Sequence, residues 1–210
     1  MQGQNAYITV TGGQCDTIFG GGNEADVRSA QVTVNCPLGA LANGAYDQVY
    51  TDAIGSYSGG DLTMDAIDGS YDWDRSGISN IRTLFGGNNR ASMEGVPTLI
   101  LTSGGIGTVY GGGNMGDMLA QAETTLVVPT THGNSENRNI KYGTHVQTNS
   151  PNILIDYLYG GCQKSNVDYS TWAEVIDGHV GTVYGGCNIS GDVGSSRVNP
   201  NVPSSPPSEE

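Results

Sequence analysis

Short runs in which apolar and polar residues alternate recur along the chain, and most are rich in β-branched side chains. Clear examples are residues 7–10, 31–34, 98–101 and 153–155. Alternation over so few residues predicts short β-strands. Helical repeats would need long runs of Ala, Leu, Glu and Lys, whereas 33 of the 210 residues are glycine and only 14% are charged. The pattern therefore predicts an all-β protein.

One motif occurs five times: an aliphatic residue, an aromatic residue and two glycines. The copies occupy residues 18–21, 84–87, 109–112, 158–161 and 183–186. Their first glycines stand at positions 20, 86, 111, 160 and 185, which gives successive gaps of 66, 25, 49 and 25. A recurring gap indicates a repeat architecture with a unit of about 25 residues. The gap of 49 then predicts one lost copy, and the gap of 66 predicts two degenerate copies and an excursion.

Alignment on the glycines shows further columns of like residues. Small apolar residues stand five positions before the first glycine and again seven positions after it. The earlier column is Cys15, Ile81, Ile106, Ile155 and Val180, and the later one is Val27, Met93, Met118 and Val167. Short strands, Gly turns and this period predict a parallel β-solenoid (β-helix) over residues 1–197. About eight coils at a spacing of about 4.8 Å would form a rod about 40 Å long.

The motif itself reads as a corner of each coil. Glycine permits tight turns and close backbone approach, and the amide that follows can bond to its equivalents in neighbouring coils. The predicted amide ladder is Asn23, Asn89, Asn114, Gln163 and Asn188. The aromatic residues either fill the corner or face outward as a strip on which sugars could stack. They are Phe19, Phe85, Tyr110, Tyr159 and Tyr184.

A column of turn-forming residues follows each glycine pair and contains Asp26 and Asp117, with Asp192 close to the same phase. It resembles in part the Gly- and Asp-rich turns of RTX β-rolls, which bind Ca²⁺ between stacked turns. That family repeats every nine residues, and two of the five copies here have Ser92 and Asn166 in place of a carboxylate. A purely structural role in the turns is the alternative to a Ca²⁺ site.

The charge and hydropathy narrow the range of partners. A net charge of −13 and a pI near 4.3 argue against nucleic acid, which requires a basic surface, and against anionic membranes. No apolar run is long enough to span a bilayer. Only two lysines occur, and this Gly-, Asn- and Thr-rich composition is typical of secreted or surface proteins.

Residues 198–210 contain four prolines and predict an extended linker or tail.

Four cysteines offer possible staples. Cys162 and Cys187 occupy the same position of successive units, and Cys15 and Cys36 are separated by slightly less than one unit. In neighbouring coils each pair would be within reach of a disulfide, which suits an oxidising compartment. Three connectivities are possible, and four buried thiols are the alternative.

An enzyme would need convergent catalytic groups, and one cluster qualifies. Asp72 and Asp74 flank Trp73 and would lie about 7 Å apart on one face of a strand, a separation suited to a glycosidase. A solvated loop with an Asp–Arg pair is the alternative reading. His132, His145 and His179 have no partner pattern and are interpreted as loop or surface residues.

Residues 6–23 and 108–114 both end in Phe/Tyr-Gly-Gly-Gly-Asn after a strand. This resembles the GGGN repeats of large secreted surface proteins from anaerobic gut bacteria, which are regarded as adhesins or stalks. The resemblance implies an extracellular structural or adhesive module without catalysis. Its partners would be carbohydrate, a host or cell-surface protein, or further copies of itself joined head to tail through unpaired end strands. A carbohydrate-active β-helix enzyme or a polysaccharide-binding module is the rival.

Overall fold

The computed structural model describes residues 5–36, 81–129 and 135–194, and over these ranges it consists of β-strands and turns without a helix. It therefore contains no helix that could cross a membrane within the described residues. Asp72, Asp74 and the predicted tail 198–210 lie outside these ranges. The eight strands are β1 (Ala6–Val10), β2 (Cys15–Phe19), β3 (Ala30–Asn35), β4 (Ile81–Phe85), β5 (Thr98–Tyr110), β6 (Ala122–Pro129), β7 (Ser135–Tyr159) and β8 (Ser170–Tyr184).

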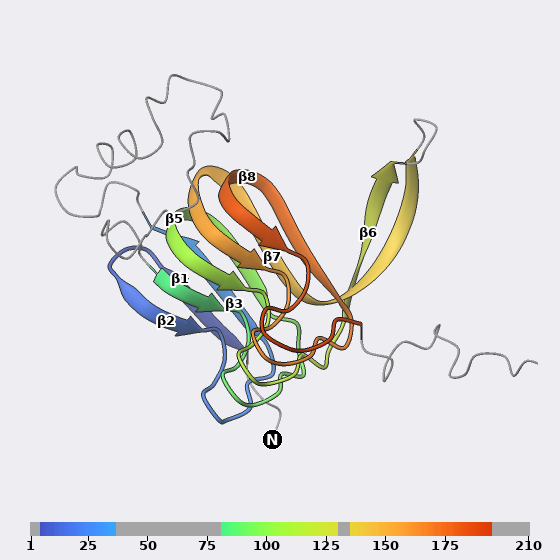
Figure 1. Ribbon diagram of the computed structural model, residues 1–210, viewed down its shortest axis with the longest axis horizontal. Coiled ribbons are helices and arrows are strands. Elements are labelled where there is room, and N and C mark those ends of the chain that lie inside the picture. Colours follow the sequence, from blue (N-terminus) through green and yellow to red (C-terminus); the bar gives the residue numbers. More distant parts are fainter. Residues whose placement is uncertain (1–4, 37–80, 130–134, 195–210) are drawn as a thin grey trace, which may run out of the picture.

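The strands form one curled, mostly parallel sheet that grows in chain order, so the colours in Figure 1 run from blue to red across the body. The first half of β5 pairs with β3, which pairs with β1, and its second half pairs with β4, which pairs with β2. Both halves of β5 pair with β7, which pairs with β8. The register places the predicted column in one line: Cys15, Ile81, Ile106, Ile155 and Val180.

The long strands bend, which gives the sheet its curl. In β5, Leu99 and Leu101 are buried before the bend, and Ile106 and Val109 are buried after it. Between them Gly104 has a φ of 119°, a conformation that glycine adopts without the steric cost of a Cβ atom. The bend therefore lets one strand contribute to two walls of the same core.

The core lies inside this curl. It consists of fully or nearly fully buried aliphatic side chains from β3, β4, β5 and β7, with Ile8, Ile18, Ala173 and Val180 packed at its two ends. A second, smaller cluster lies beneath the turns that follow the glycine pairs: Ala30, Met93, Met118, Cys162 and Val167. In that cluster Met93 bridges to Met118, Met118 to Val167, and Val167 to Val193, so the later apolar column is also in register.

The gap of 49 residues does not hold a lost copy, contrary to the sequence prediction, and in neither gap does a described strand separate the flanking copies. β5 pairs directly with β7, so nothing lies between the copies at Gly111 and Gly160. The additional residues form a hairpin in which β6 pairs antiparallel with the start of β7, and Figure 1 shows it projecting from the body. Similarly β2 pairs directly with β4, although the longest gap of the repeat separates them in the chain. Within the described residues, the five copies are therefore consecutive levels of the sheet, and these residues form fewer than the expected eight coils.

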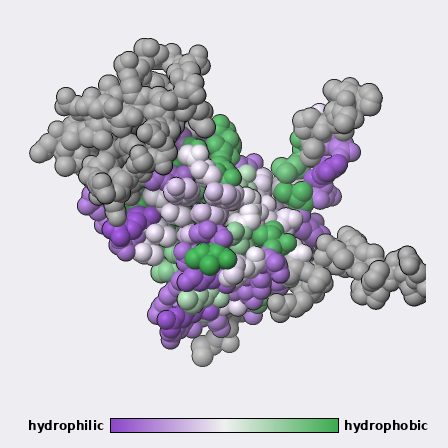
Figure 2. Space-filling view, viewed as in Figure 1, coloured by the Kyte–Doolittle hydropathy of each residue, from purple (hydrophilic) through white to green (hydrophobic). Residues whose placement is uncertain are grey.

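The surface shown in Figure 2 is mostly polar, with separate hydrophobic patches near the bend of β8 and over β6. Val127 on β6 is 67% exposed, and Ile176 on β8 is 63% exposed. The strand at the end of the sheet therefore carries apolar side chains that are not covered by another level.

Candidate functional site

The glycine pairs lie where the backbones of successive levels approach each other closely. A Cβ atom on Gly20 would lie 2.1 Å from the carbonyl oxygen of Gly86, and one on Gly111 would lie 2.3 Å from that of Gly160. None of the paired glycines has a positive φ. Of the two reasons for glycine that the sequence offers, close backbone approach is the one that applies to the pairs.

The five aromatic residues of the motif form one continuous stack. Neighbouring ring centroids are 4.7 to 5.1 Å apart, with interplanar angles of 8° to 12°. Phe85 and Tyr110 in the middle are buried, whereas Tyr184 at the end is 47% exposed. The rings cover one another's faces, so the stack holds the levels together and offers an open face only at its ends.

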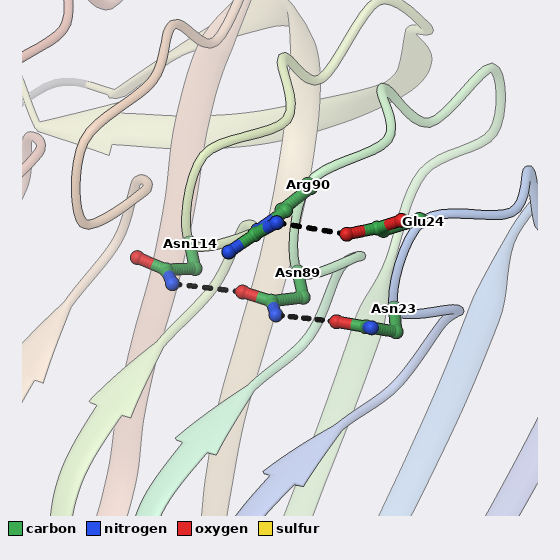
Figure 3. A network of polar contacts seen from close by, with 5 residues as sticks. All are labelled: Asn23, Glu24, Asn89, Arg90 and Asn114. Atoms are coloured by element: carbon green, nitrogen blue, oxygen red, sulfur yellow. Dashed lines mark hydrogen bonds and ion pairs between the residues drawn. The ribbon is translucent and has the colours of Figure 1, made fainter.

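The amides of the motif form a ladder over the first three levels (Figure 3). Asn114 donates to Asn89 Oδ1 at 2.8 Å, and Asn89 donates to Asn23 Oδ1 at 2.6 Å. Beside them an ion pair of 2.8 Å joins Arg90 to Glu24.

In the last two levels the amides have a different acceptor. Gln163 and Asn188 both donate to the hydroxyl of Tyr110, at 3.2 and 2.8 Å. The buried Oδ1 of Asn114 consequently has no hydrogen-bond partner. The amide ladder changes its acceptor where the motif aromatic changes from phenylalanine to tyrosine, since only tyrosine offers a hydroxyl.

The turn column that suggested Ca²⁺ contributes hydrogen bonds between levels. Asp117 Oδ1 accepts from the N–H of Asn166 at 2.9 Å, and Asn166 Oδ1 accepts from the N–H of Asp192 at the same distance. Asp26 is exposed on the first of these turns. Within the described part of the chain, no group of three or more His, Cys, Asp or Glu residues is arranged to hold a metal ion.

All four cysteines are free thiols in this structure. Cys162 and Cys187 are neighbours: the Cys162 N–H donates to Cys187 Sγ at 3.3 Å. A hydrogen bond between the two thiols lowers the pKa of Cys187 to about 7 and, together with burial, raises that of Cys162. Cys15 and Cys36 do not lie opposite each other, because Cys15 aligns with Ile81 and the Cys36 thiol faces the carbonyl of Val10.

A further side-chain cluster lies on the outer face of β7 and β8, at the base of the hairpin. We call it the Trp172 cluster, and it comprises Tyr142, His145, Gln147, Trp172 and Glu174. The rings of His145 and Trp172 stack with centroids 4.1 Å apart, and Tyr142 packs edge-on against Trp172 at 4.8 Å. Glu174 Oε2 lies 3.1 Å from His145 Nε2 and accepts from Gln147 at 3.2 Å.

The Trp172 cluster combines an aromatic platform with polar groups. Burial, and secondarily the charge of Glu174, raises the pKa of Tyr142. His145 and Tyr142 contact Trp172 from the β7 side, so the opposite face of the indole points to the free edge of β8. An aromatic face beside a carboxylate and an amide is suited to a ligand with both apolar and hydroxyl surfaces.

Sequence reasoning did not find the Trp172 cluster and interpreted His145 as an isolated surface residue. His145 and Trp172 lie in different units of the repeat and become neighbours through the β7–β8 register. Their separation of close to one unit was the available signal, but neither residue belongs to the glycine motif on which the repeats were aligned.

Comparison of the chain with protein-family models, with curated proteins and with solved structures finds no match.

Proposed function

We propose that this chain is a structural or adhesive module of a secreted or cell-surface protein, built as a parallel β-solenoid without catalytic activity. It would serve as a stalk, an adhesin or a filament subunit. The observation that carries the proposal is the continuous aromatic stack from Phe19 to Tyr184. Residues repeated along the chain bind to their own equivalents in the next level, as expected where repetition serves to extend a scaffold.

The remaining repeated columns support the same proposal. The amides of Asn89 and Asn114, the side chain of Asp117 and the paired glycines all make their contacts with a neighbouring level. An enzyme or a small-molecule receptor instead needs convergent groups that are left unpaired for a ligand. Repeated contacts used within the protein favour a role in support or display.

The solenoid is tested by removing one unit. Excision of residues 86–110 joins Phe85 to Gly111 and preserves the register, because Phe85 and Tyr110 occupy equivalent positions. The shortened protein should still fold, so its circular dichroism signal should show a single cooperative unfolding transition as urea is added. A control excision of residues 86–105 removes less than one unit, destroys the register and should not fold. If both excisions unfold the protein equally, the repeat unit is not the building block of the fold.

The extracellular location rests on the resemblance to GGGN-repeat surface proteins and on the composition. Antibodies raised against the chain should label intact cells of the source organism as strongly as permeabilised cells. Labelling that requires permeabilisation would contradict the proposed location.

Carbohydrate binding is a second candidate function, which the Trp172 cluster specifically favours. A glycan array and isothermal calorimetry with the best-bound glycan would test it. Trp172→Ala should abolish binding, and Glu174→Gln should weaken it. Tyr157→Ala, which removes a 45% exposed aromatic residue outside the cluster, is the matched control. Binding that survives Trp172→Ala would exclude this site.

Two rivals need their own tests. Hydrolysis of a polysaccharide panel that is lost in Asp72→Asn or Asp74→Asn would replace the structural proposal with a carbohydrate-active enzyme.

A module stabilised by Ca²⁺ through Asp26, Asp117 and Asp192 would melt at a lower temperature in EDTA, whereas an unchanged melting temperature removes that possibility.

A further inference from the structure

The last level of the sheet ends without a partner. β8 pairs with β7 and with no other described strand. Val183 aligns with the fully buried Leu158 but is 46% exposed, and Tyr184 aligns with Tyr159 but is 47% exposed. Val193 continues the buried column of Val167 and is 38% exposed. Three columns that are covered in the preceding level are therefore open at this edge.

The glycines at this edge are the most specific feature. Gly20, Gly86, Gly111 and Gly160 each need to be glycine because a Cβ atom would collide with the carbonyl of the next level. Gly185 occupies the same position, yet a Cβ atom there would have nothing within 4 Å, and the same holds for Gly186. Neither has a positive φ. Within the described structure, no contact at this edge accounts for glycine at these two positions.

The backbone at this edge also has unused hydrogen-bonding groups. Gly160 N–H donates to Tyr184 O at 2.8 Å, and Gly161 N–H donates to Gly186 O at 3.0 Å. The equivalent N–H groups of Gly185 and Gly186 donate to no backbone carbonyl of the described residues. A level that docked here would have to offer two carbonyls in the geometry of a glycine-pair turn.

The opposite end of the same chain offers that turn. β1 and β2 pair only with β3 and β4 among the described strands, so the first level also has a free edge. In the register of the repeat, its Phe19 and Gly21 carbonyls would accept from Gly185 and Gly186. Ile18 would follow Val183 and Phe19 would follow Tyr184, each with a residue of the same kind.

We propose that a second copy of this chain docks its first level, β1 and β2, on the β8 edge, so that the columns continue from copy to copy. This inference deepens the proposed function and rests on it, since it assumes that the levels are equivalent units. Tyr7, which is 73% exposed, would then lie beside Trp172 on the outer face of the sheet. Within such an assembly, Trp172 would be accessible to a ligand only in the last copy, because Tyr7 of the next copy would cover its ring in every other copy.

The contact joins two different surfaces and therefore does not close on itself. A head-to-tail contact of this kind generates open filaments unless its rotation closes a ring. Each copy carries a net charge of −13, and the docking would place Asp26 beside Asp192. Salt screens such repulsion, so assembly should increase as the NaCl concentration is raised from about 0.05 M to about 0.5 M.

Gly185→Ala is the first test. The substitution should leave the melting temperature of the monomer unchanged, because a Cβ atom meets nothing in the single chain. It should abolish the concentration-dependent increase in sedimentation coefficient, because the Cβ atom would collide with the Gly20 carbonyl of the docked copy. Val127→Lys, which alters a 67% exposed apolar residue on β6, away from the β8 edge, should assemble like wild type. Assembly of Gly185→Ala equal to wild type overturns the proposal.

A cross-link between an introduced cysteine and the native Cys15 tests the register. Val180 occupies the column of Cys15, which is exposed and unoxidised. In Val180→Cys the new thiol would face Cys15 of the docked copy at a Cα separation of about 4.8 Å, within disulfide range. Mild oxidation should give reducible oligomers whose linked peptides contain residues 15 and 180. Ile176→Cys, on the same strand but out of this register, should not form that link. Equal cross-linking of the two variants overturns the register.

The outcomes separate this inference from the proposed function. If excision of residues 86–110 leaves a folded protein but neither copy-to-copy test is positive, the solenoid stands and the docking fails. If Gly185→Ala instead lowers the melting temperature of a monomeric protein, a segment of the same chain covers the β8 edge, and a second copy is not its occupant.

Discussion

The side-chain Oδ1 of Asn88 accepts a hydrogen bond of 2.8 Å from the N–H of Gly22, although the two residues are far apart in the chain. The other end of the same amide donates to the carbonyl of Ser92 at 3.0 Å. Asn88 is fully buried, and a Cβ atom on Gly21 would overlap its Oδ1. One amide thus joins the turns of the first two levels, and an adjacent glycine leaves the space for it.

Asn88→Ala should destabilise the protein by about 3 kcal/mol, because it removes a fully buried amide and leaves the half-buried N–H of Gly22 and carbonyl of Ser92 without these partners. Urea unfolding followed by circular dichroism measures the loss. Asn89→Ala is the matched control: it removes the ladder bonds to Asn23 and Asn114 from a half-buried site and should cost about 1 kcal/mol. Equal losses in the two variants would contradict the role assigned to Asn88.

Gly111→Ala should be among the most damaging single substitutions, at about 3 kcal/mol or more. Its Cβ atom would lie 2.3 Å from the Gly160 carbonyl oxygen and 3.0 Å from a Val146 methyl group. Gly12→Ala, where a Cβ atom meets nothing within 4 Å, should change stability by less than about 0.5 kcal/mol. Thermal melting of both variants checks the difference. A tolerated Gly111→Ala would mean that the levels are not as close as the structure places them.

Oxidation should join Cys162 to Cys187 and leave Cys15 and Cys36 unlinked within one chain. Because the thiolate is the reactive form and the pKa of Cys187 is lowered to about 7, the rate should rise most steeply near pH 7. The bond should stabilise the protein by about 3 kcal/mol, as expected for a loop of this size. Peptide mapping and urea unfolding of oxidised and reduced protein test this. Cys187→Ser should show no gain on oxidation.

Acid should destabilise the protein partly through His179. Burial lowers the pKa of His179 from its ordinary value of 6.5, and the charge of Asp177 opposes the shift only partly. As pH falls below 6.5, the unfolded chain binds the proton first, so stability falls with falling pH. When the pH is lowered from about 7.5 to about 5.5, through the range in which histidine titrates, the urea midpoint of His179→Gln should fall less than that of wild type. An identical loss in wild type and variant would exclude His179 as a contributor.

The sequence by itself determined that the chain forms β-strands and which residues share a column, but it did not predict the long, bent strands β5, β7 and β8 of 13, 25 and 15 residues. Alternation predicted short strands, and β3 shows the expected pattern, with Ala30, Val32 and Val34 buried between more exposed neighbours. Alignment on the glycines predicted which residues share a column, and the register confirms it for Ile81, Ile106 and Ile155. Strand formation depends on neighbouring residues, and the columns repeat at a fixed spacing, so both can be predicted from the sequence.

Only the tertiary structure decided what fills the gap between Gly111 and Gly160 and where unlike residues meet. The gap between Gly111 and Gly160 holds a hairpin and no lost copy, because an antiparallel excursion can leave a parallel sheet and return to it without changing the register. The Trp172 cluster depends on contacts between levels that no motif marks. Gln163 and Asn188 belong to the motif, but their hydrogen bonds to Tyr110, in place of the predicted bonds between amides, follow from the tertiary arrangement. The structure also showed why the paired glycines are required: the carbonyl of the next level occupies the position of a side chain, and that level is distant in sequence.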